Sequence, residues 1–210
     1  MNAITKSTKE KILDLLKKEE QMTVNDLTHR LEITHMAVRK HLNSLEKDGL
    51  IASKTIKQPM GRPLQLYTLS NKAQSHFPKN YEGISVEFLH DIKEIHGEES
   101  VELLFKKRED RLTREYSKRL GNKSTVQEKL HELTDIQNEK GYMAELTRVD
   151  ENTFELTEYN CPIFSVAKEY KVACRCETEL FKNILGTERI NRSCCQTDGY
   201  SHCKFLFQIN

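Results

Sequence analysis

The segment TVNDLTHRLEITHMAVRKHLNSLEKDG, residues 23–49, decides the fold of the N-terminal part of the chain. Thr23 and Thr34 each have the position of a helix N-terminal cap, and Gly49 is placed to end the second helix. Apolar residues recur at helical spacing in both segments. They are Val24, Leu27, Leu31, Val38, Leu42 and Leu45. The pattern predicts two short amphipathic helices joined by a tight turn, the second running from Thr34 to about Asp48.

The flanking sequence completes a recognisable motif. Ser7 and Glu10 form a capping box, so a helix is expected from about Thr8 to Glu20, with Ile12, Leu13, Leu15 and Leu16 on its buried side. Residues 50–56 and 64–69 have strand patterns, and the connection 57–63 between them is basic. A helix-turn-helix followed by a basic hairpin is the winged arrangement.

The helix from Thr34 to about Asp48 is the third helix of the chain, and its exposed side has the residue types that read DNA. Arg and Asn suit guanine and adenine edges in the major groove, whereas Lys meets phosphates. We therefore expect a double-stranded DNA contact through the third helix and the wing. The expected contact residues are Thr34, His35, Met36, Arg39, Lys40, Asn43, Lys57 and Arg62. The alternative is an ordinary solvated helix face.

Charge distribution favours the DNA-binding interpretation. The chain has 210 residues and a formal net charge of +1. Residues 1–80 nevertheless contain 14 Lys and Arg against 8 Asp and Glu, whereas residues 81–210 contain 19 against 24. A basic module joined to an acidic one fits binding of a polyanion by the first module alone. The sequence shows neither a membrane-spanning run nor a signal peptide, so a cytoplasmic location is expected.

This N-terminal region resembles the winged helix-turn-helix of bacterial regulators of the DeoR and ArsR type. The resemblance extends over residues 7–77 and rests on 33–42, 45–51, Gly61-Arg62-Pro63 and Tyr67-Thr68-Leu69-Ser70. It implies DNA binding but no particular operator.

Two helices are expected to connect the ends of the chain. Residues 78–83 have a linker composition, 86–96 are predicted helical, and Glu98–Leu120 forms a longer helix ended by Gly121. The long helix has an apolar stripe made of Val101, Leu104, Phe105, Leu112, Tyr116 and Leu120. The stripe serves either a dimer interface or packing on the C-terminal domain. A homodimer on a palindromic operator is expected, because helix-turn-helix proteins usually bind two half-sites.

The C-terminal part is predicted to be an α+β domain. Helices are expected over 125–139, 163–170 and 177–185, and strands over 142–149, 153–158, 190–197 and 201–209. The expected organisation is a winged helix-turn-helix domain over 1–78, a helical linker or dimerisation region over 79–122 and an α+β cysteine-rich sensor domain over 123–210.

All six cysteines lie between Cys161 and Cys203, which points to metal or redox chemistry in a cytoplasmic chain. No C-x2-C pair is present, so a zinc knuckle or ribbon is not favoured. Thiolates delivered from separate elements suit an iron–sulfur cluster, which accepts widely spaced ligands.

The cysteine region resembles the C-terminal domain of SufR-type repressors. The matching segments are 160–162, 174–181, 185–186 and 199–203. This resemblance implies a cluster-binding sensor, with 4Fe–4S favoured over 2Fe–2S, that controls operator affinity and iron–sulfur assembly genes. The family spacing C-x12-C-x13-C-x14-C places ligands at Cys161, Cys174, position 188 and Cys203.

Position 188 is Glu, which departs from the family pattern. A carboxylate is a harder ligand than a thiolate and makes a more labile site. Glu188, Cys194 or Cys195 is therefore a possible fourth ligand, and the alternative is that Glu188 is a surface residue, which leaves three protein ligands and an exchangeable position. Purified protein is expected to lose the cluster easily.

A cluster-controlled repressor is thus the main hypothesis. The alternative is a winged-helix regulator with a thiol switch, at Cys194 and Cys195 or at Cys174 and Cys176, or with another metal or ligand. An enzyme is not expected, since the chain lacks a phosphate-binding glycine loop, a nucleophile elbow and a zinc-hydrolase motif.

Overall fold

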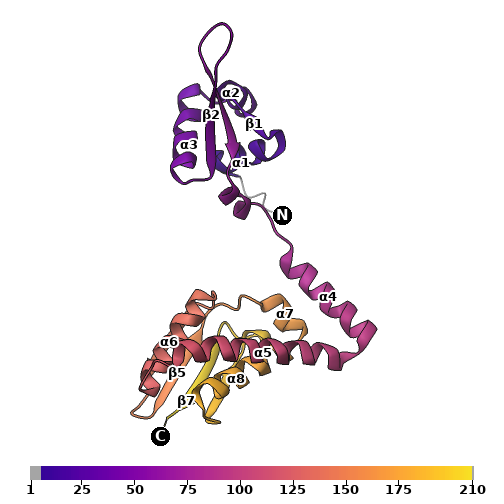
Figure 1. Ribbon diagram of the computed structural model, residues 1–210, viewed down its shortest axis with the longest axis vertical. Coiled ribbons are helices and arrows are strands. Elements are labelled where there is room, and N and C mark those ends of the chain that lie inside the picture. Colours follow the sequence, from indigo (N-terminus) through magenta and orange to yellow (C-terminus); the bar gives the residue numbers. More distant parts are fainter. Residues whose placement is uncertain (1–5, 210) are drawn as a thin grey trace. The chain divides into compact units, whose positions relative to one another are not determined.

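A computed structural model describes residues 6–209 and divides the chain into two compact units, Met1–Lys79 and Asn80–Asn210 (Figure 1). The N-terminal unit contains α1 (Thr8–Glu19), β1 (Gln21–Met22), α2 (Val24–Leu31), α3 (His35–Lys47), β2 (Ile51–Ile56), β3 (Leu64–Leu69) and the 3-10 helix η1 (Asn71–His76). Its three strands form an antiparallel sheet in the order β1-β3-β2.

The helix starts of the N-terminal unit follow the predicted caps. Ser7 with Glu10 and Thr23 with Asp26 both form complete capping boxes, and Thr34 accepts a hydrogen bond from the amide of Ala37. The three helices pack on one aliphatic core together with Tyr67. Its fully buried members include Ile12, Leu16, Leu27, Val38, Leu42 and Leu45. The predicted winged helix-turn-helix is therefore present.

The C-terminal unit begins with a helical hairpin. It contains α4 (Tyr81–His96), α5 (Glu98–Leu120), α6 (Val126–Glu139), β4 (Ala144–Arg148), β5 (Thr153–Glu158), α7 (Phe164–Glu169), α8 (Val172–Leu185), β6 (Ile190–Cys194), the 3-10 helix η2 (Gln196–Asp198) and β7 (Cys203–Gln208). The predicted α+β class is confirmed.

The four strands form one antiparallel sheet in the order β4-β5-β7-β6. Side chains of α5, α6 and α8 meet the apolar side of this sheet in a single core. Phe181 of α8 lies at its centre, with its ring 4.8 Å from that of Phe205 and edge-on to it. The stripe predicted on α5 faces inward at Val101, Phe105, Tyr116 and Leu120, so α5 serves the core of its own unit.

Two helices begin earlier than the sequence predicts. α4 starts at Tyr81 and absorbs part of the expected linker, while α8 starts at Val172 and includes Cys174 and Cys176. Neither start has a side-chain cap hydrogen bond: Asn80 precedes α4 without capping it, and Lys171, which precedes α8, is not a capping residue type. Among the described residues, no helix combines the length and apolar character needed to cross a membrane.

Candidate DNA-binding face and cysteine centre

The third helix and the wing present the expected contact residues to solvent. Thr34, His35, Met36, Arg39, Lys40 and Asn43 are exposed on or beside α3, and Lys57 and Arg62 are exposed in the wing connection. Val38, Leu42 and Leu45 on the opposite side of α3 are buried. The helix is thus held by its apolar side, while its polar side remains available.

The cations of this face are not neutralised within the chain. Among residues 6–209, the side chains of Arg39, Lys40, Lys57 and Arg62 have no hydrogen-bond or ion-pair partner. Lys54 on β2 is a further exposed cation that sequence reasoning did not select. Unpaired cations at a protein surface attract phosphate groups. The arrangement therefore suits a DNA backbone beside the reading helix.

A second site lies in the C-terminal unit, where four cysteines line one cavity. Cys161 follows β5, Cys174 lies in the first turn of α8, Cys195 follows β6 and Cys203 begins β7. The Sγ atom of Cys195 lies 3.8 Å from that of Cys174 and 3.7 Å from that of Cys203. Four elements far apart in sequence thus converge their thiols on one space.

The dimensions of this space limit what it can hold. In a tetrahedral thiolate site with metal–sulfur bonds of about 2.3 Å, neighbouring sulfurs are about 3.8 Å apart. The Cys195–Cys174 and Cys195–Cys203 separations match this value, but among the described residues no three thiols lie within 4.8 Å of one another. The cavity has a volume of about 10 Å³, which is room for one water-sized particle. A single metal ion therefore requires the other thiols to draw together around Cys195, whereas a cluster of several iron and sulfur atoms requires the cavity to widen.

The other expected ligands lie elsewhere. The side chain of Glu188 is 85% exposed and forms an ion pair with Lys182 at 3.3 Å. Cys194 directs its Sγ atom to the carbonyl oxygen of His202, 3.6 Å away. Of the three alternatives for a fourth ligand, Cys195 is the one that lines the cavity. Cys176 lines no part of it and lies beside Glu109 of α5.

A buried ion pair borders the thiols. Arg192 and Glu177 are joined at 2.7 Å, with both side chains largely buried. The Arg192 guanidinium also approaches the Cys195 Sγ atom at 3.7 Å and stacks over the ring of Phe205 at 4.4 Å. A fixed positive charge beside the cavity favours thiolate over thiol.

The thiols differ in acidity. Burial raises the pKa of Cys161 to about 11 and also raises the pKa of Cys174 and of Cys203. Burial opposes ionisation of Cys195 as well, but hydrogen bonds from Thr197 and the charge of Arg192 together lower the pKa of Cys195. The Cys195 Sγ and Thr197 Oγ1 atoms are 3.2 Å apart. Cys195 is thus the thiol best prepared to bind a cation.

The floor of the cavity has a buried carboxyl group. Glu158 is almost inaccessible and accepts a hydrogen bond of 2.7 Å from the Gln137 amide, which in turn accepts one of 2.9 Å from the Tyr116 hydroxyl. Burial, reinforced by the charge of Glu177, raises the pKa of Glu158 well above its usual range. The charged groups nearest the thiols are therefore the paired Arg192 and Glu177 rather than Glu158.

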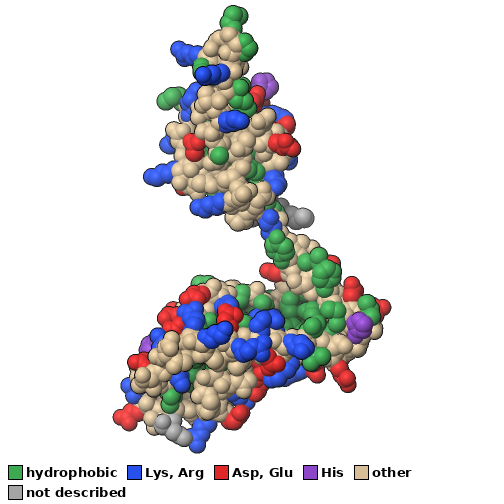
Figure 2. Space-filling model, in the orientation of Figure 1, with side chains coloured by type: hydrophobic (Ala, Val, Ile, Leu, Met, Phe, Trp, Pro, Cys, Tyr) green, Lys and Arg blue, Asp and Glu red, His purple; other side chains and the backbone are tan. Residues whose placement is uncertain are grey.

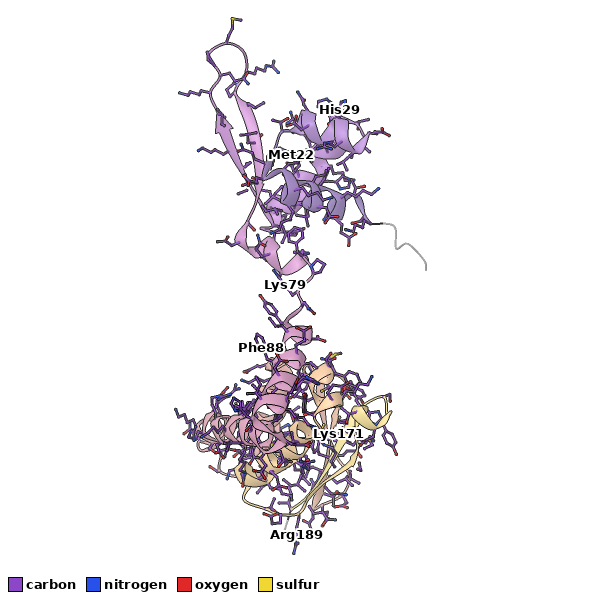
Figure 3. All side chains as sticks on the ribbon, turned by 90° about the vertical axis from the view of Figure 1, so that its right-hand side faces the viewer. Met22, His29, Lys79, Phe88, Lys171 and Arg189 are labelled. Carbon is purple, nitrogen blue, oxygen red and sulfur yellow. The ribbon has the colours of Figure 1, made fainter. Side chains whose placement is uncertain are left out.

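Lys171, labelled in Figure 3, fastens the segment that carries Thr197. Its Nζ atom donates to the Thr197 carbonyl oxygen at 2.5 Å, to the Thr197 hydroxyl at 2.7 Å and to the Asp198 carboxylate at 2.6 Å. These bonds tie η2 to the start of α8, so they fix Cys195 relative to Cys174.

Sequence reasoning missed Glu158, Glu177, Arg192 and Thr197 as neighbours of the centre. A signal was available for two of them. On β5 the inward positions alternate as Phe154, Leu156 and Glu158, and on β6 Arg192 follows inward Ile190 at the same period. A charged residue at an inward strand position indicates a functional or paired group.

Comparison with known proteins identifies the class. Residues 6–52 match the family of winged helix-turn-helix DNA-binding domains. The match supports a winged helix-turn-helix DNA-binding domain in the N-terminal unit of the chain. This match does not distinguish SufR-type repressors from other winged helix-turn-helix proteins.

Solved structures that resemble the chain include three regulators. The zinc-responsive MarR family member Lactococcus lactis ZitR is 23% identical over 45% of this chain and 78% of its own, with a TM-score of 0.29. Bacillus subtilis PadR in complex with operator DNA is 15% identical over 84% and 93%, with a TM-score of 0.30. The phenol-responsive sensory domain of the transcription activator PoxR is 12% identical over 61% and 74%, with a TM-score of 0.46. These TM-scores are too low to support a functional argument. No curated protein matches the chain.

Proposed function

We propose that this regulator binds its operator as a homodimer and that a metal centre held by Cys161, Cys174, Cys195 and Cys203 controls its DNA affinity. The observation that carries the proposal is the convergence of these four thiols on one cavity, with sulfur separations of 3.7 and 3.8 Å. The proposed DNA contacts are Thr34, His35, Met36, Arg39, Lys40, Asn43, Lys57 and Arg62, and the proposed location is the cytoplasm.

The donor set suits a soft or borderline metal. Thiolates select zinc, copper(I) or iron in iron–sulfur clusters, whereas magnesium and calcium prefer oxygen. A bound metal would supply positive charge that stabilises the ionised thiolates against the cost of burial. The size of the cavity supports a single zinc-type ion as the first candidate.

An iron–sulfur cluster is the second candidate. Four cysteines are the ligand number that such clusters use, and the resemblance to SufR-type repressors favours a 4Fe–4S cluster over 2Fe–2S. In that version the protein is a repressor of iron–sulfur assembly genes, and the fourth ligand is Cys195. The cavity must then widen on binding.

The ordering of the site explains how a metal could act at a distance. Cys161 precedes α7 and Cys174 lies on α8, and these helices pack with α4 and α5 in one apolar cluster. A metal that joins Cys161 to the other thiols would restrain this cluster, and α4 begins next to the N-terminal unit in the chain. Control requires that the metal-bound and metal-free states differ in DNA affinity.

The test begins with protein purified without oxygen. One sample is loaded with zinc, one is reconstituted with iron and sulfide, and one is treated with a chelator. Operator DNA is selected from a random pool by each sample, and affinity is measured at fixed salt, since salt alone changes DNA binding. We expect at least one loaded form to differ from the metal-free form by about 10-fold or more, a coupling typical of regulators. Equal affinities in all three forms contradict the proposal.

Metal content and colour separate the two candidates. Stoichiometric zinc in a colourless protein supports the single-ion centre, whereas iron, acid-labile sulfide and visible charge-transfer bands support the cluster. A colourless, metal-free protein whose DNA affinity changes only on oxidation favours a thiol switch at these cysteines.

A further inference from the structure

An apolar surface on α4 has no partner within the described chain. Tyr81, Ile84, Phe88 and Ile95 are 73%, 41%, 59% and 72% exposed. The adjacent side of the same helix, at Leu89 and Ile92, packs against the apolar cluster of α5 and α7. Figure 2 shows hydrophobic side chains gathered in the corner between α4 and α5, and Figure 3 marks Phe88 on α4. Contiguous exposed apolar surface of this kind marks an interaction site.

The spacing of the exposed residues indicates the kind of partner. Tyr81, Ile84, Phe88 and Ile95 occupy positions a, d, a and a of successive heptads, with Asp91 at the intervening d position. Heptad spacing is the signature of a helix that packs lengthwise along another helix. The 16 residues of α4 extend over about 24 Å, which is long enough for two helical heptads of contact.

A groove runs beside this stripe between α4 and α5. It has a volume of about 550 Å³, an apolar floor that includes Phe88, Leu104 and Phe105, and Lys107, Arg108 and Arg111 on its rim. Among residues 6–209, these three cations have no hydrogen-bond or ion-pair partner. The groove therefore suits an apolar occupant with negative charge along one side.

The second copy of α4 has that composition. Glu87 and Glu94 are exposed, seven residues apart, and lie on the side of the stripe away from the groove, and the exposed Asp91, at the d position of the stripe, lies at that edge of it. Glu87 and Asp91 also lack an ion-pair partner among the described residues. One side of the stripe is thus acidic and the other basic.

We infer that α4 and the groove beside it form a homodimer surface, in which the α4 helices of two copies pack in parallel. In a parallel pair related by a two-fold axis along the helices, the left side of one helix faces the right side of the other. The acidic side of each α4 therefore faces the basic rim of the partner's groove. An antiparallel pair would instead place acid against acid. Parallel helices also start at the same end, so both chains enter the dimer from one side, as a regulator with two DNA half-sites requires.

This inference rests on the proposed function only in taking the regulator to be a homodimer.

The first test is Phe88→Glu, with Val149→Glu as the matched control, since Val149 is 57% exposed on a turn away from the stripe. Wild type and Val149→Glu should sediment as dimers. Phe88→Glu should raise the dimer dissociation constant by about 30-fold or more, the effect of a central aromatic residue at an interface, with an unchanged far-ultraviolet circular dichroism spectrum.

A charge-swap pair tests the orientation. Glu87→Lys with Asp91→Lys makes both sides of the stripe basic, and Lys107→Glu with Arg111→Glu makes both sides acidic. Each double variant should repel itself and sediment as a monomer, whereas an equimolar mixture should form a one-to-one dimer. A monomeric wild type, a dimeric Phe88→Glu variant, or double variants that dimerise alone would each overturn the inference.

The test also distinguishes other occupants and other failures. If wild type is monomeric and decanoate binds in the groove by calorimetry, the occupant is an amphiphilic anion and the inference is wrong. If Phe88→Glu stays dimeric while metal still changes DNA affinity, the inference fails and the proposed function stands. If the dimer behaves as expected but metal leaves DNA affinity unchanged, the proposed metal control fails and the dimer surface stands.

Discussion

The two compact units place their functional groups in opposite environments. In the N-terminal unit the core is aliphatic and the candidate DNA contacts are exposed cations without internal partners. In the C-terminal unit the candidate ligands are thiols at the end of an apolar core, beside the buried residues Glu158 and Arg192. Substitution of a DNA-contact residue in the N-terminal unit should therefore have little effect on folding. In the C-terminal unit the candidate metal ligands are also part of the packed interior, so their substitution affects both folding and metal binding.

The sharpest test of this contrast uses two adjacent cysteines. Cys195→Ser should lower zinc affinity by more than about 100-fold, because it removes a ligand, and loss of an outer-shell partner alone costs 10–100-fold. Cys194→Ser should leave the affinity within about 3-fold, since the Cys194 thiol faces the His202 carbonyl oxygen. Competition with a chromophoric chelator under anaerobic conditions measures both. Equal losses in the two variants would show that the cavity does not hold the metal.

The core of the N-terminal unit gives the next largest effect. Leu42 is completely buried on α3, so Leu42→Ala should destabilise this unit by about 2–5 kcal/mol. Met36→Ala on the same helix should change stability by less than about 0.5 kcal/mol, because Met36 is 80% exposed. Urea titration with hydrogen exchange of peptides from each unit follows the two units separately. Zinc affinity should be unchanged in both variants, and a parallel loss would mean that the units are energetically coupled.

The same contrast explains what the sequence could predict. The α1, α2 and α3 starts were predictable because Ser7, Thr23 and Thr34 are side-chain caps, and Gly121 ends α5 where expected. The two-residue strand β1 was missed, since it exists only through pairing with β3. Local signals thus suffice where an element is capped, and fail where tertiary pairing creates it.

The candidate metal centre was harder to predict because its ligands meet only in the folded sheet. Cys161, Cys174 and Cys203 were expected from the resemblance to SufR-type repressors, but the choice among Glu188, Cys194 and Cys195 depends on how the chain is directed at the two ends of β6. The irregular pairing between Arg192 and Cys194 on β6 alters the alternation just before Cys195. The strict alternation of a regular strand therefore does not predict which way the Cys194 and Cys195 side chains point.

A change at the DNA-reading face should leave folding intact. Arg39→Ala removes an exposed, unpaired cation of α3 and should weaken binding to selected operator DNA by about 1–3 kcal/mol. Lys18→Ala, on α1, is the control of equal charge change outside the third helix and the wing. Fluorescence anisotropy at fixed salt measures the difference, and circular dichroism checks the fold. If both variants bind equally, charge alone and no specific contact accounts for the role of Arg39.

The smallest effect concerns a helix cap and depends on pH. Hydrogen bonds from the Thr23 backbone and side chain lower the pKa of Asp26. A carboxyl group whose pKa is lower in the folded state stabilises that state above its unfolded value, and this stabilisation is lost as pH falls through the folded value. Asp26→Asn should therefore destabilise α2 by about 0.3–1 kcal/mol at pH 7, and the difference from wild type should shrink below about pH 4. Hydrogen exchange of peptides spanning residues 23–31 gives the local stability at each pH. A difference that stays constant from neutral to acidic pH would show that the Asp26 charge is not the stabilising group, and that the hydrogen bonds of this side chain with Thr23 act independently of its charge.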